Sequence, residues 1–145
     1  MTLQKHKSIR FFDKFVLLIP PKLKYRTDGI IESRSLFITD PSESFLITFE
    51  EGMKLMDMLP EAKVEPSVCF QCFKDGKYIH LRRKSDGKVS CAFFHIELED
   101  ENGNPVYLPG QMVASSGYNW SDGIEPVLME LLAGISLNNE LDSCD

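Results

Sequence analysis

The clearest alternation of apolar and polar positions in the chain runs from Ser67 to Leu98. Within it, Asp75-Gly76 and Asp86-Gly87 each separate runs that are rich in strand-forming residues. An Asp-Gly pair suits a two-residue hairpin loop, because both of its central residues take positive φ angles. The pattern therefore predicts three antiparallel strands joined by two tight turns.

The two predicted loops also predict a register. Around the first turn the predicted pairs are Phe73 with Tyr78, Cys72 with Ile79, Gln71 with His80, Phe70 with Leu81 and Cys69 with Arg82. Around the second turn they are Arg82 with Cys91, Leu81 with Ala92, His80 with Phe93, Ile79 with Phe94 and Tyr78 with His95.

Side chains alternate between the two faces of a strand, so this register sorts the residues into two sets. The first set is entirely apolar or thiol-bearing, which predicts the core face. It consists of Val68, Phe70, Cys72, Ile79, Leu81, Ala92, Phe94, Ile96 and Leu98.

The second set mixes aromatic, basic and thiol side chains. It consists of Cys69, Gln71, Phe73, Tyr78, His80, Arg82, Cys91, Phe93 and His95. One interpretation is a sheet face that is partly covered by a helix or loop, for which the segment Glu51 to Leu59 is the best candidate. The other is a partner-binding face, because aromatic residues and arginine dominate interface hot spots. Its predicted anchors are Phe73, Tyr78, His80, Arg82 and Phe93.

The first half of the chain predicts further strands. Residues 1–10 form a frayed end or an edge strand, and Phe11 to Ile19 reads as a strand that ends at Pro20-Pro21. Ser35 to Thr39 and Ser44 to Glu50 form a hairpin whose turn, residues 40–43, contains Asp, Pro and Ser.

Helical spacing appears twice. In Glu51 to Leu59, the methionines form a short stripe that serves either core packing or an adaptable binding surface. A longer helix begins at Ser121 or Asp122. Its apolar positions follow the i, i+3, i+4, i+7 rule and are Ile124, Val127, Leu128, Leu131, Leu132 and Ile135.

Between the central strands and this helix, two strand segments are predicted. Val106 to Leu108 and Gln111 to Ser115 lie on either side of a break at Pro109-Gly110. Residues 1–137 are predicted to form a single domain, and residues 138–145 a disordered acidic tail.

Composition narrows the function classes. A chain of 145 residues with a net charge of −6 fits one domain, and no run approaches the ~20 apolar residues of a membrane helix. Residues 1–84 carry 15 Lys and Arg against 11 Asp and Glu, whereas residues 85–145 carry 1 against 11. The acidic half would repel phosphate, so we expect no nucleic-acid partner and no membrane association. Basic and acidic surfaces would pair within the molecule or between copies, so a homo-oligomer stays open.

Little in the sequence points to catalysis. Cys69 and Cys72 match a CxxC motif, but in mid-strand they point to opposite faces and cannot converge on a metal or a disulfide. Four free thiols fit a reducing compartment, and Phe15 to Ile19 is too short for a secretory signal, so a cytoplasmic location is expected.

His80 and His95 share the outer face, two positions out of register. With Cys91 or Tyr78 they would form a sparse metal site, or they are simply hydrogen-bonded locally. No carboxylate is expected on their face within the three strands, so neither has a partner for base catalysis. We expect no enzyme, no cofactor and no bound metal.

The order of elements resembles the PsbP-like domains. The residues that carry the resemblance are Leu18-Ile19-Pro20-Pro21, Lys74-Asp75-Gly76-Lys77 and the predicted helix from Trp120 to Leu137. That group includes a photosystem subunit, a nuclear-transport factor and bacterial chaperones of secreted toxins. The predicted Glu51 to Leu59 helix is shorter than the family's long helix. The resemblance implies a central antiparallel sheet flanked by helices, no enzyme activity and a protein partner.

The sequence thus predicts an α+β fold, with an antiparallel sheet of about six or seven strands packed against a C-terminal helix. The predicted function is non-catalytic protein binding, as an adaptor, chaperone or accessory subunit. The alternative is a small-ligand or metal-binding domain that uses the His80 and His95 face.

Overall fold

The computed structural model describes residues 6–52, 69–74, 77–86, 89–115, 117–120 and 125–138, with the side chains of residues 69–90 left aside. These residues form ten strands and one helix. The strands are β1 (Lys7–Phe11), β2 (Phe15–Ile19), β3 (Lys24–Asp28), β4 (Ser35–Thr39), β5 (Phe45–Glu50), β6 (Cys69–Lys74), β7 (Lys77–Asp86), β8 (Val89–Glu99), β9 (Pro105–Ser115) and β10 (Ile135–Leu137), and the helix is α2 (Pro126–Ala133).

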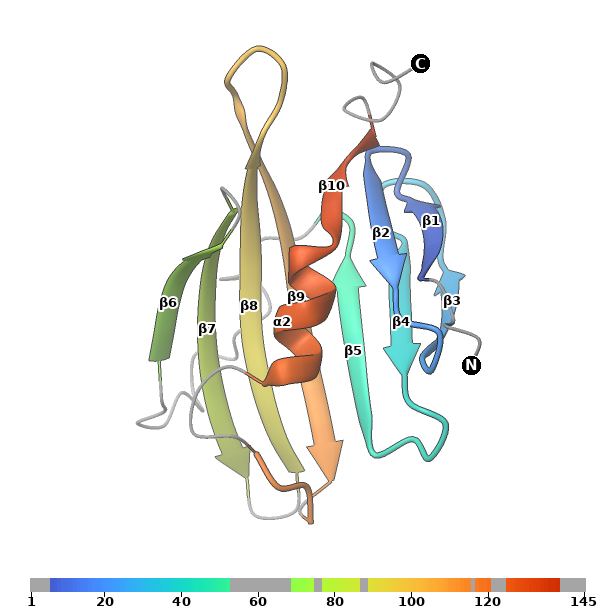
Figure 1. Ribbon diagram of the computed structural model, residues 1–145, viewed down its shortest axis with the longest axis vertical. Helices are drawn as coiled ribbons and strands as arrows, with labels where there is room; N and C mark the ends of the chain where they lie inside the picture. Colours follow the sequence, from blue (N-terminus) through green and yellow to red (C-terminus); the bar gives the residue numbers. More distant parts are fainter. Residues whose placement is uncertain are drawn as a thin grey trace, which may run out of the picture.

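The strands form two antiparallel sheets. The larger has seven strands in the order β3-β4-β5-β9-β8-β7-β6, and the smaller has three in the order β1-β2-β10. Helix α2 and the smaller sheet lie against one face of the larger sheet, which we call the inner face (Figure 1). The α+β class and the antiparallel arrangement are confirmed, but the strands are divided between two sheets rather than gathered in one.

The core lies between these layers. On the inner face, the apolar residues of β4 and β5 point into the core: Leu36, Ile38, Ile47 and Phe49 are fully buried and Phe45 is 8% exposed. The predicted core face is confirmed on β8, where Ala92, Phe94, Ile96 and Leu98 are all buried. Helix α2 contributes Leu128, Leu131 and Leu132, each fully buried. Among the described residues, no helix combines the length and the apolar character that crossing a membrane requires.

The register of the central strands is half confirmed. All five predicted pairs of β6 with β7 are present. Between β7 and β8 the predicted register is wrong by two residues: Arg82 faces Phe93 instead of Cys91, and His80 faces His95 instead of Phe93. In the same way Leu81 faces Phe94, Ile79 faces Ile96 and Tyr78 faces Glu97. A shift of two keeps every side chain on its original face, so alternation alone cannot detect it.

The start of the chain contains a turn that the sequence did not predict. Instead of one strand from Phe11 to Ile19, β1 and β2 form a hairpin that reverses through Phe12 and Asp13, whose φ angles are 53° and 60°. The Phe12 ring is 3% exposed and packs edge-on against Phe11 and Phe15, at centroid distances of 5.0 and 6.5 Å. This burial offsets the cost of a left-handed backbone at a bulky residue.

Two predicted boundaries near the end of the chain are also wrong. Strand β9 runs through Pro109 without a break, because β5 pairs with β9 only as far as Gly110 and leaves Pro109 a partner strand on one side only. Helix α2 stops at Ala133, since Gly134 caps it, and Ile135 continues as a strand residue opposite Leu17. The predicted helix from Glu51 to Leu59 and the predicted acidic tail lie outside the described residues, except for Glu51, Gly52 and Asn138.

Candidate binding surface on the outer sheet face

The face of the seven-stranded sheet opposite the core, which we call the outer face, carries a continuous row of paired residues. The pairing runs from β3 at one edge to β6 at the other. The row is Arg26, Phe37, Thr48, Gln111, Phe93, Arg82 and Cys69. The five predicted partner anchors lie on this same outer face by their strand positions.

The middle of the outer face is not open. Phe93, one of the predicted anchors, is 5% exposed, and Thr48 two strands away is 3% exposed. A residue buried to this extent contributes little contact area to an incoming partner. Side chains of the other four anchors, Phe73, Tyr78, His80 and Arg82, lie outside the described set, so the five-residue site stays a prediction.

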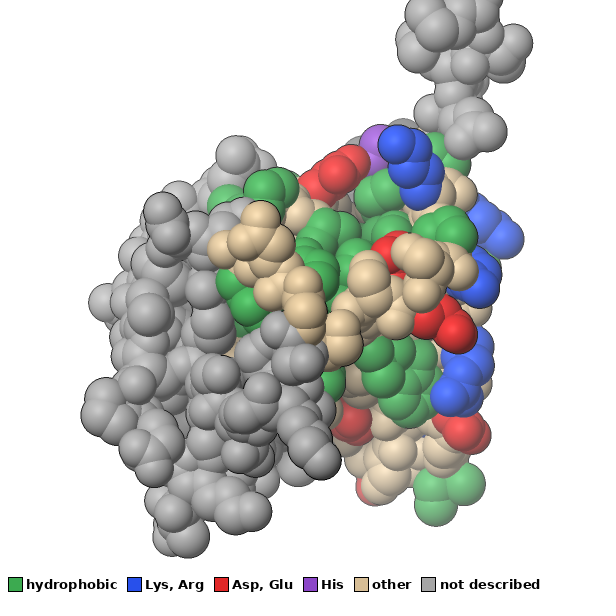
Figure 2. Space-filling model, turned by 90° about the horizontal axis from the view of Figure 1, so that it is seen from below, with side chains coloured by type: hydrophobic (Ala, Val, Ile, Leu, Met, Phe, Trp, Pro, Cys, Tyr) green, Lys and Arg blue, Asp and Glu red, His purple; other side chains and the backbone are tan. Residues whose placement is uncertain are grey.

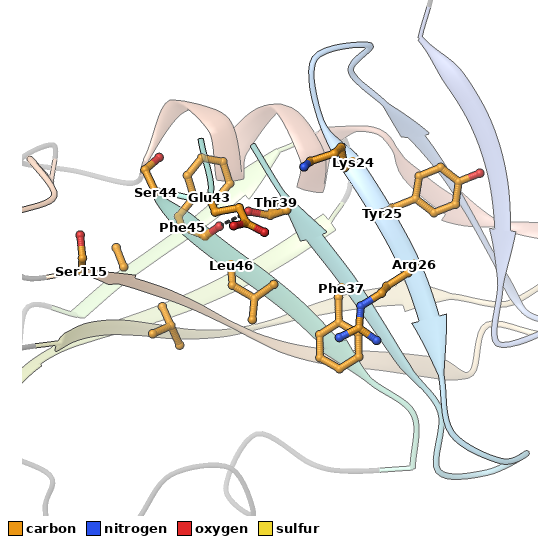
Figure 3. A pocket seen from close by; sticks show the side chains of 12 residues that line it. Lys24, Tyr25, Arg26, Phe37, Thr39, Glu43, Ser44, Phe45, Leu46 and Ser115 are labelled. Carbon is orange, nitrogen blue, oxygen red and sulfur yellow. Dashed lines mark hydrogen bonds between the residues drawn. The ribbon is translucent and has the colours of Figure 1, made fainter. Parts of the chain in front are cut away.

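The outer face opens toward β3, where a shallow pocket of about 560 Å³ lies over β3, β4, β5 and the end of β9 (Figure 3). Its apolar floor is provided by Phe37, Leu46 and Val113, of which Leu46 is 38% exposed. We call this pocket the outer-face groove. Sequence reasoning missed it, although Phe37, Leu46 and Val113 are apolar residues at positions that alternate with the core-facing ones.

Basic side chains border the groove on the β3 side. The guanidinium of Arg26 lies over the Phe37 ring, with Cζ 4.4 Å from the ring centroid, and Lys24 follows on the same face (Figure 3). Lys and Arg side chains gather along the margin of the molecule on the side of β1 and β3 (Figure 2). Arg26 also pairs with Asp28 at 3.5 Å, but both side chains are well exposed and such a pair is weak.

The turn between β4 and β5 forms the other end of the groove. Asp40 accepts hydrogen bonds from the Ser44 backbone N–H at 2.7 Å, from the Ser44 hydroxyl and from the Ser42 hydroxyl at 3.0 Å. Burial alone would raise the pKa of Asp40, but these hydrogen bonds outweigh it, and the pKa of Asp40 lies below its ordinary value. The carboxylate is used to hold the turn and is not available as a proton acceptor.

An aromatic group supports this turn from the inner side. Tyr118 packs edge-on against Phe45 and Trp120, at centroid distances of 6.2 and 5.1 Å. Its hydroxyl donates to Glu125 Oε2 at 3.0 Å, and Glu125 is 4% exposed. Burial, followed by this hydrogen bond, raises the pKa of Tyr118 to about 12, so the hydroxyl stays protonated and the pair serves structure.

A second charged cluster lies outside the groove, where the β1–β2 turn meets the β3–β4 loop. Arg34 donates from Nε and Nη2 to the two oxygens of Glu51, both at 2.7 Å, and from Nη2 to Asp13 Oδ2 at 3.2 Å. Glu51 Oε1 also accepts the backbone N–H of Glu32 at 2.8 Å. The hydrogen bonds from Arg34 lower the pKa of Glu51 to about 2. Because the carboxylate is saturated with donors, we interpret this cluster as a clamp that holds three chain segments.

The histidines of the outer face lie closer together than the sequence predicted. His80 and His95 are a direct cross-strand pair, and Glu97 occupies the same face two residues beyond His95. The expectation that no carboxylate shares their face is therefore wrong, and extending the alternation along β8 by two residues would have found it. Where side chains are described, no three His, Cys, Asp or Glu residues gather as a metal site.

No family model matches this chain, and no curated protein or solved structure matches it either.

Proposed function

We propose that this chain is a non-catalytic protein-binding domain, acting as an adaptor, chaperone or accessory subunit, and that the outer-face groove holds its partner. The observation that carries the proposal is the exposure of Leu46 on a sheet whose opposite face already has a complete core. Leu46, with Phe37 and Val113, offers apolar area that a partner would remove from water. A PsbP-like architecture, with a hairpin, a meander and a terminal helix, is proposed alongside it and agrees with a binding role.

The groove favours a partner segment that carries an apolar side chain next to a carboxylate. The apolar side chain would cover Phe37 and Leu46, while the carboxylate would meet Lys24 and Arg26. The Arg26 guanidinium lies over the Phe37 ring, and a guanidinium in contact with a ring still has N–H groups that can donate to a carboxylate. Such contacts favour acidic partners and weaken as the salt concentration rises.

The proposal is tested by selecting peptides from a random displayed library on the full chain and measuring their affinities by fluorescence anisotropy. We expect the selected peptides to share an apolar residue beside Asp or Glu. Leu46→Ala and Arg26→Glu should each weaken binding about tenfold or more, as expected at an interface hot spot. Leu18→Ala is the matched control, since Leu18 is 46% exposed on β2 in the smaller sheet.

Because Leu46 and Arg26 contribute little to the core, their variants should keep the thermal midpoint of the unaltered chain. Selected peptides that bind both variants as tightly as the unaltered chain would contradict the groove as the site. If Tyr78→Ala instead removes binding, the partner occupies the β7 end of the outer face.

A further inference from the structure

The β3–β4 loop, residues 29–33, presents two aliphatic side chains to solvent. Ile30 is 77% exposed and Ile31 is 71% exposed, which makes them the most exposed large apolar side chains in the part of the chain that the structure describes. Single exposed apolar residues are common on protein surfaces, but two adjacent isoleucines at one loop tip form a contiguous apolar patch. Exposed carboxylates flank the pair, since Asp28 precedes the loop and Glu32 directly follows Ile31.

Hydrogen bonds fix the conformation of this loop. The Ser33 N–H donates to the Ile30 carbonyl at 2.8 Å and closes a tight turn. The Glu32 N–H donates at 2.8 Å to Glu51 Oε1, and Glu51 is itself held by Arg34. The φ angle of Glu32 is 76°, a backbone conformation that costs free energy and needs such support. A loop that is ordered in advance loses little entropy when it binds, so the two isoleucines are presented ready for a partner.

The outer-face groove has the complementary chemistry. Its floor includes the apolar side chains of Phe37 and Leu46, and its β3 border carries Lys24 and Arg26. Its volume of about 560 Å³ lies within the ~300–1,000 Å³ that is usual for binding pockets, so the tip of a loop fits the space. The groove favours an apolar side chain beside a carboxylate, and the β3–β4 loop of this same chain is a segment of that kind.

The loop and the groove lie toward opposite ends of β3. The loop follows Asp28, whereas the groove includes Lys24 and its cross-strand partner Thr39. The two ends of this five-residue strand are ~13 Å apart, and the clamp keeps the loop at its own end. A two-fold axis near the middle of β3 would exchange the two ends between two copies of the chain. Each loop would then meet the groove of the other copy.

We propose that two copies of this chain associate about such an axis, with the β3–β4 loop of each copy bound in the outer-face groove of the other. The proposal rests on the proposed function of the groove as a binding surface and names a second copy as its occupant. Ile30 and Ile31 are removed from water against Leu46. Glu32 meets the guanidinium of Arg26. Because both copies use the same two features, the contact closes at a dimer and does not propagate into a fibre.

Sedimentation velocity of the full chain over a range of concentrations measures this association. We expect a monomer–dimer equilibrium that weakens as salt rises, because exposed charges are screened. The double variant Ile30→Ser/Ile31→Ser should dimerise about tenfold or more weakly, as expected when hot-spot residues are truncated. Leu18→Ser is the matched control, since Leu18 is 46% exposed on β2, away from the loop and the groove. A chain that is monomeric at every concentration, or a dimer that persists in the double variant, overturns the proposal.

Reversing charges tests which surfaces meet. Glu32→Arg and Arg26→Glu should each weaken dimerisation about tenfold or more, because like charges then face each other in both contacts of the dimer. The hydrogen bond from Glu32 to Glu51 uses the backbone N–H, so Glu32→Arg retains it. An equimolar mixture of the two variants should dimerise again, since one contact joins the two reversed charges and the other joins the two unaltered ones. A mixture that stays monomeric contradicts this contact.

The same variants separate this proposal from the proposed function. Ile30→Ser/Ile31→Ser leaves the groove residues unchanged, so this variant should bind the selected peptides at least as tightly as the unaltered chain. If the unaltered chain is monomeric and the peptides still bind the groove, the occupant is a different protein, and the dimer alone is overturned. If neither a peptide nor a second copy binds the groove, the proposed function fails together with the dimer.

Discussion

The Phe94 ring lies directly over Gly110, its cross-strand partner on β9. A Cβ placed on Gly110 would be 2.7 Å from both Cε2 and Cζ of Phe94, and 2.8 Å from the backbone oxygen of Thr48. Gly110 is also paired with Phe49 on its other side, and the Phe49 and Phe94 rings meet edge-on with centroids 5.6 Å apart. The glycine leaves the space into which the two central rings of the core pack.

Gly110→Ala should therefore destabilise the fold by about 1–3 kcal/mol, the usual cost of overpacking a core. The new methyl group meets a buried ring and a backbone oxygen, and neither can move aside freely. Urea unfolding followed by circular dichroism measures the change. Gly117→Ala is the control, because a Cβ there meets nothing within 4 Å. Equal stability of the two variants would mean that the ring does not lie over Gly110.

Phe94→Ala should cost about 3–5 kcal/mol, because the side chain is fully buried. The double variant Phe94→Ala/Gly110→Ala should lose less stability than the sum of the two single variants, because removing the ring removes its clash with the new methyl group. The clash between this methyl group and the Thr48 oxygen would remain, so only part of the cost of Gly110→Ala should disappear. A double-mutant cycle from urea unfolding measures this coupling, and strict additivity would argue against contact.

The alternation of residues predicted which side chains are buried far better than it predicted which residues are paired. Ala92, Phe94 and Ile96 are in the core as expected. The β7–β8 register could not be predicted, because a shift of two residues leaves every side chain on the same face of the sheet. The Asp86-Gly87 pair is compatible with the predicted register and with the observed one. The direct pairing of His80 with His95 depends on this shift, so the sequence could not predict it either.

Local sequence patterns also failed to predict the secondary structure at positions where tertiary packing determines the backbone conformation. The turn through Phe12 and Asp13 contains no glycine, and it is stabilised by burial of the Phe12 ring and by the hydrogen bond from Arg34 to Asp13. Ile135 fits the helical period as well as it fits a strand, and Gly134 together with pairing to Leu17 settles its place in β10. The outer-face groove depends on which part of the outer face is left uncovered, which no local pattern encodes.

Glu51→Gln should make the stability of the protein less sensitive to acid. The folded pKa of Glu51, about 2, lies below its ordinary 4.5, so its stabilising effect is complete above pH 4.5 and is lost as the pH falls toward 2. The variant should be less stable than the unaltered chain at pH 7, because the charged pair with Arg34 is gone. On acidification, it should lose less stability than the unaltered chain does.

Urea midpoints at pH 7, 4.5 and 2.5 test this expectation. Glu130→Gln is the control, since Glu130 forms an exposed pair with His6 and its side chain is 54% exposed. Parallel acid profiles for Glu51→Gln and the unaltered chain would show that the clamp does not titrate as described.

Tyr118→Phe should destabilise the protein by about 1–3 kcal/mol, because it removes a hydrogen-bond donor from the buried Glu125 carboxylate while leaving the ring contacts with Phe45 and Trp120 intact. The folded pKa of Tyr118, about 12, lies above its ordinary 10.0, so its stabilising effect is complete below pH 10 and is lost as the pH rises through 12. Absorbance at 295 nm should show a late tyrosine ionisation that is absent from Tyr118→Phe and retained in Tyr107→Phe, where the ring is 55% exposed. If Tyr118→Phe instead keeps the late ionisation and full stability, the hydroxyl does not donate to Glu125, and the turn between β4 and β5 is supported by ring packing alone.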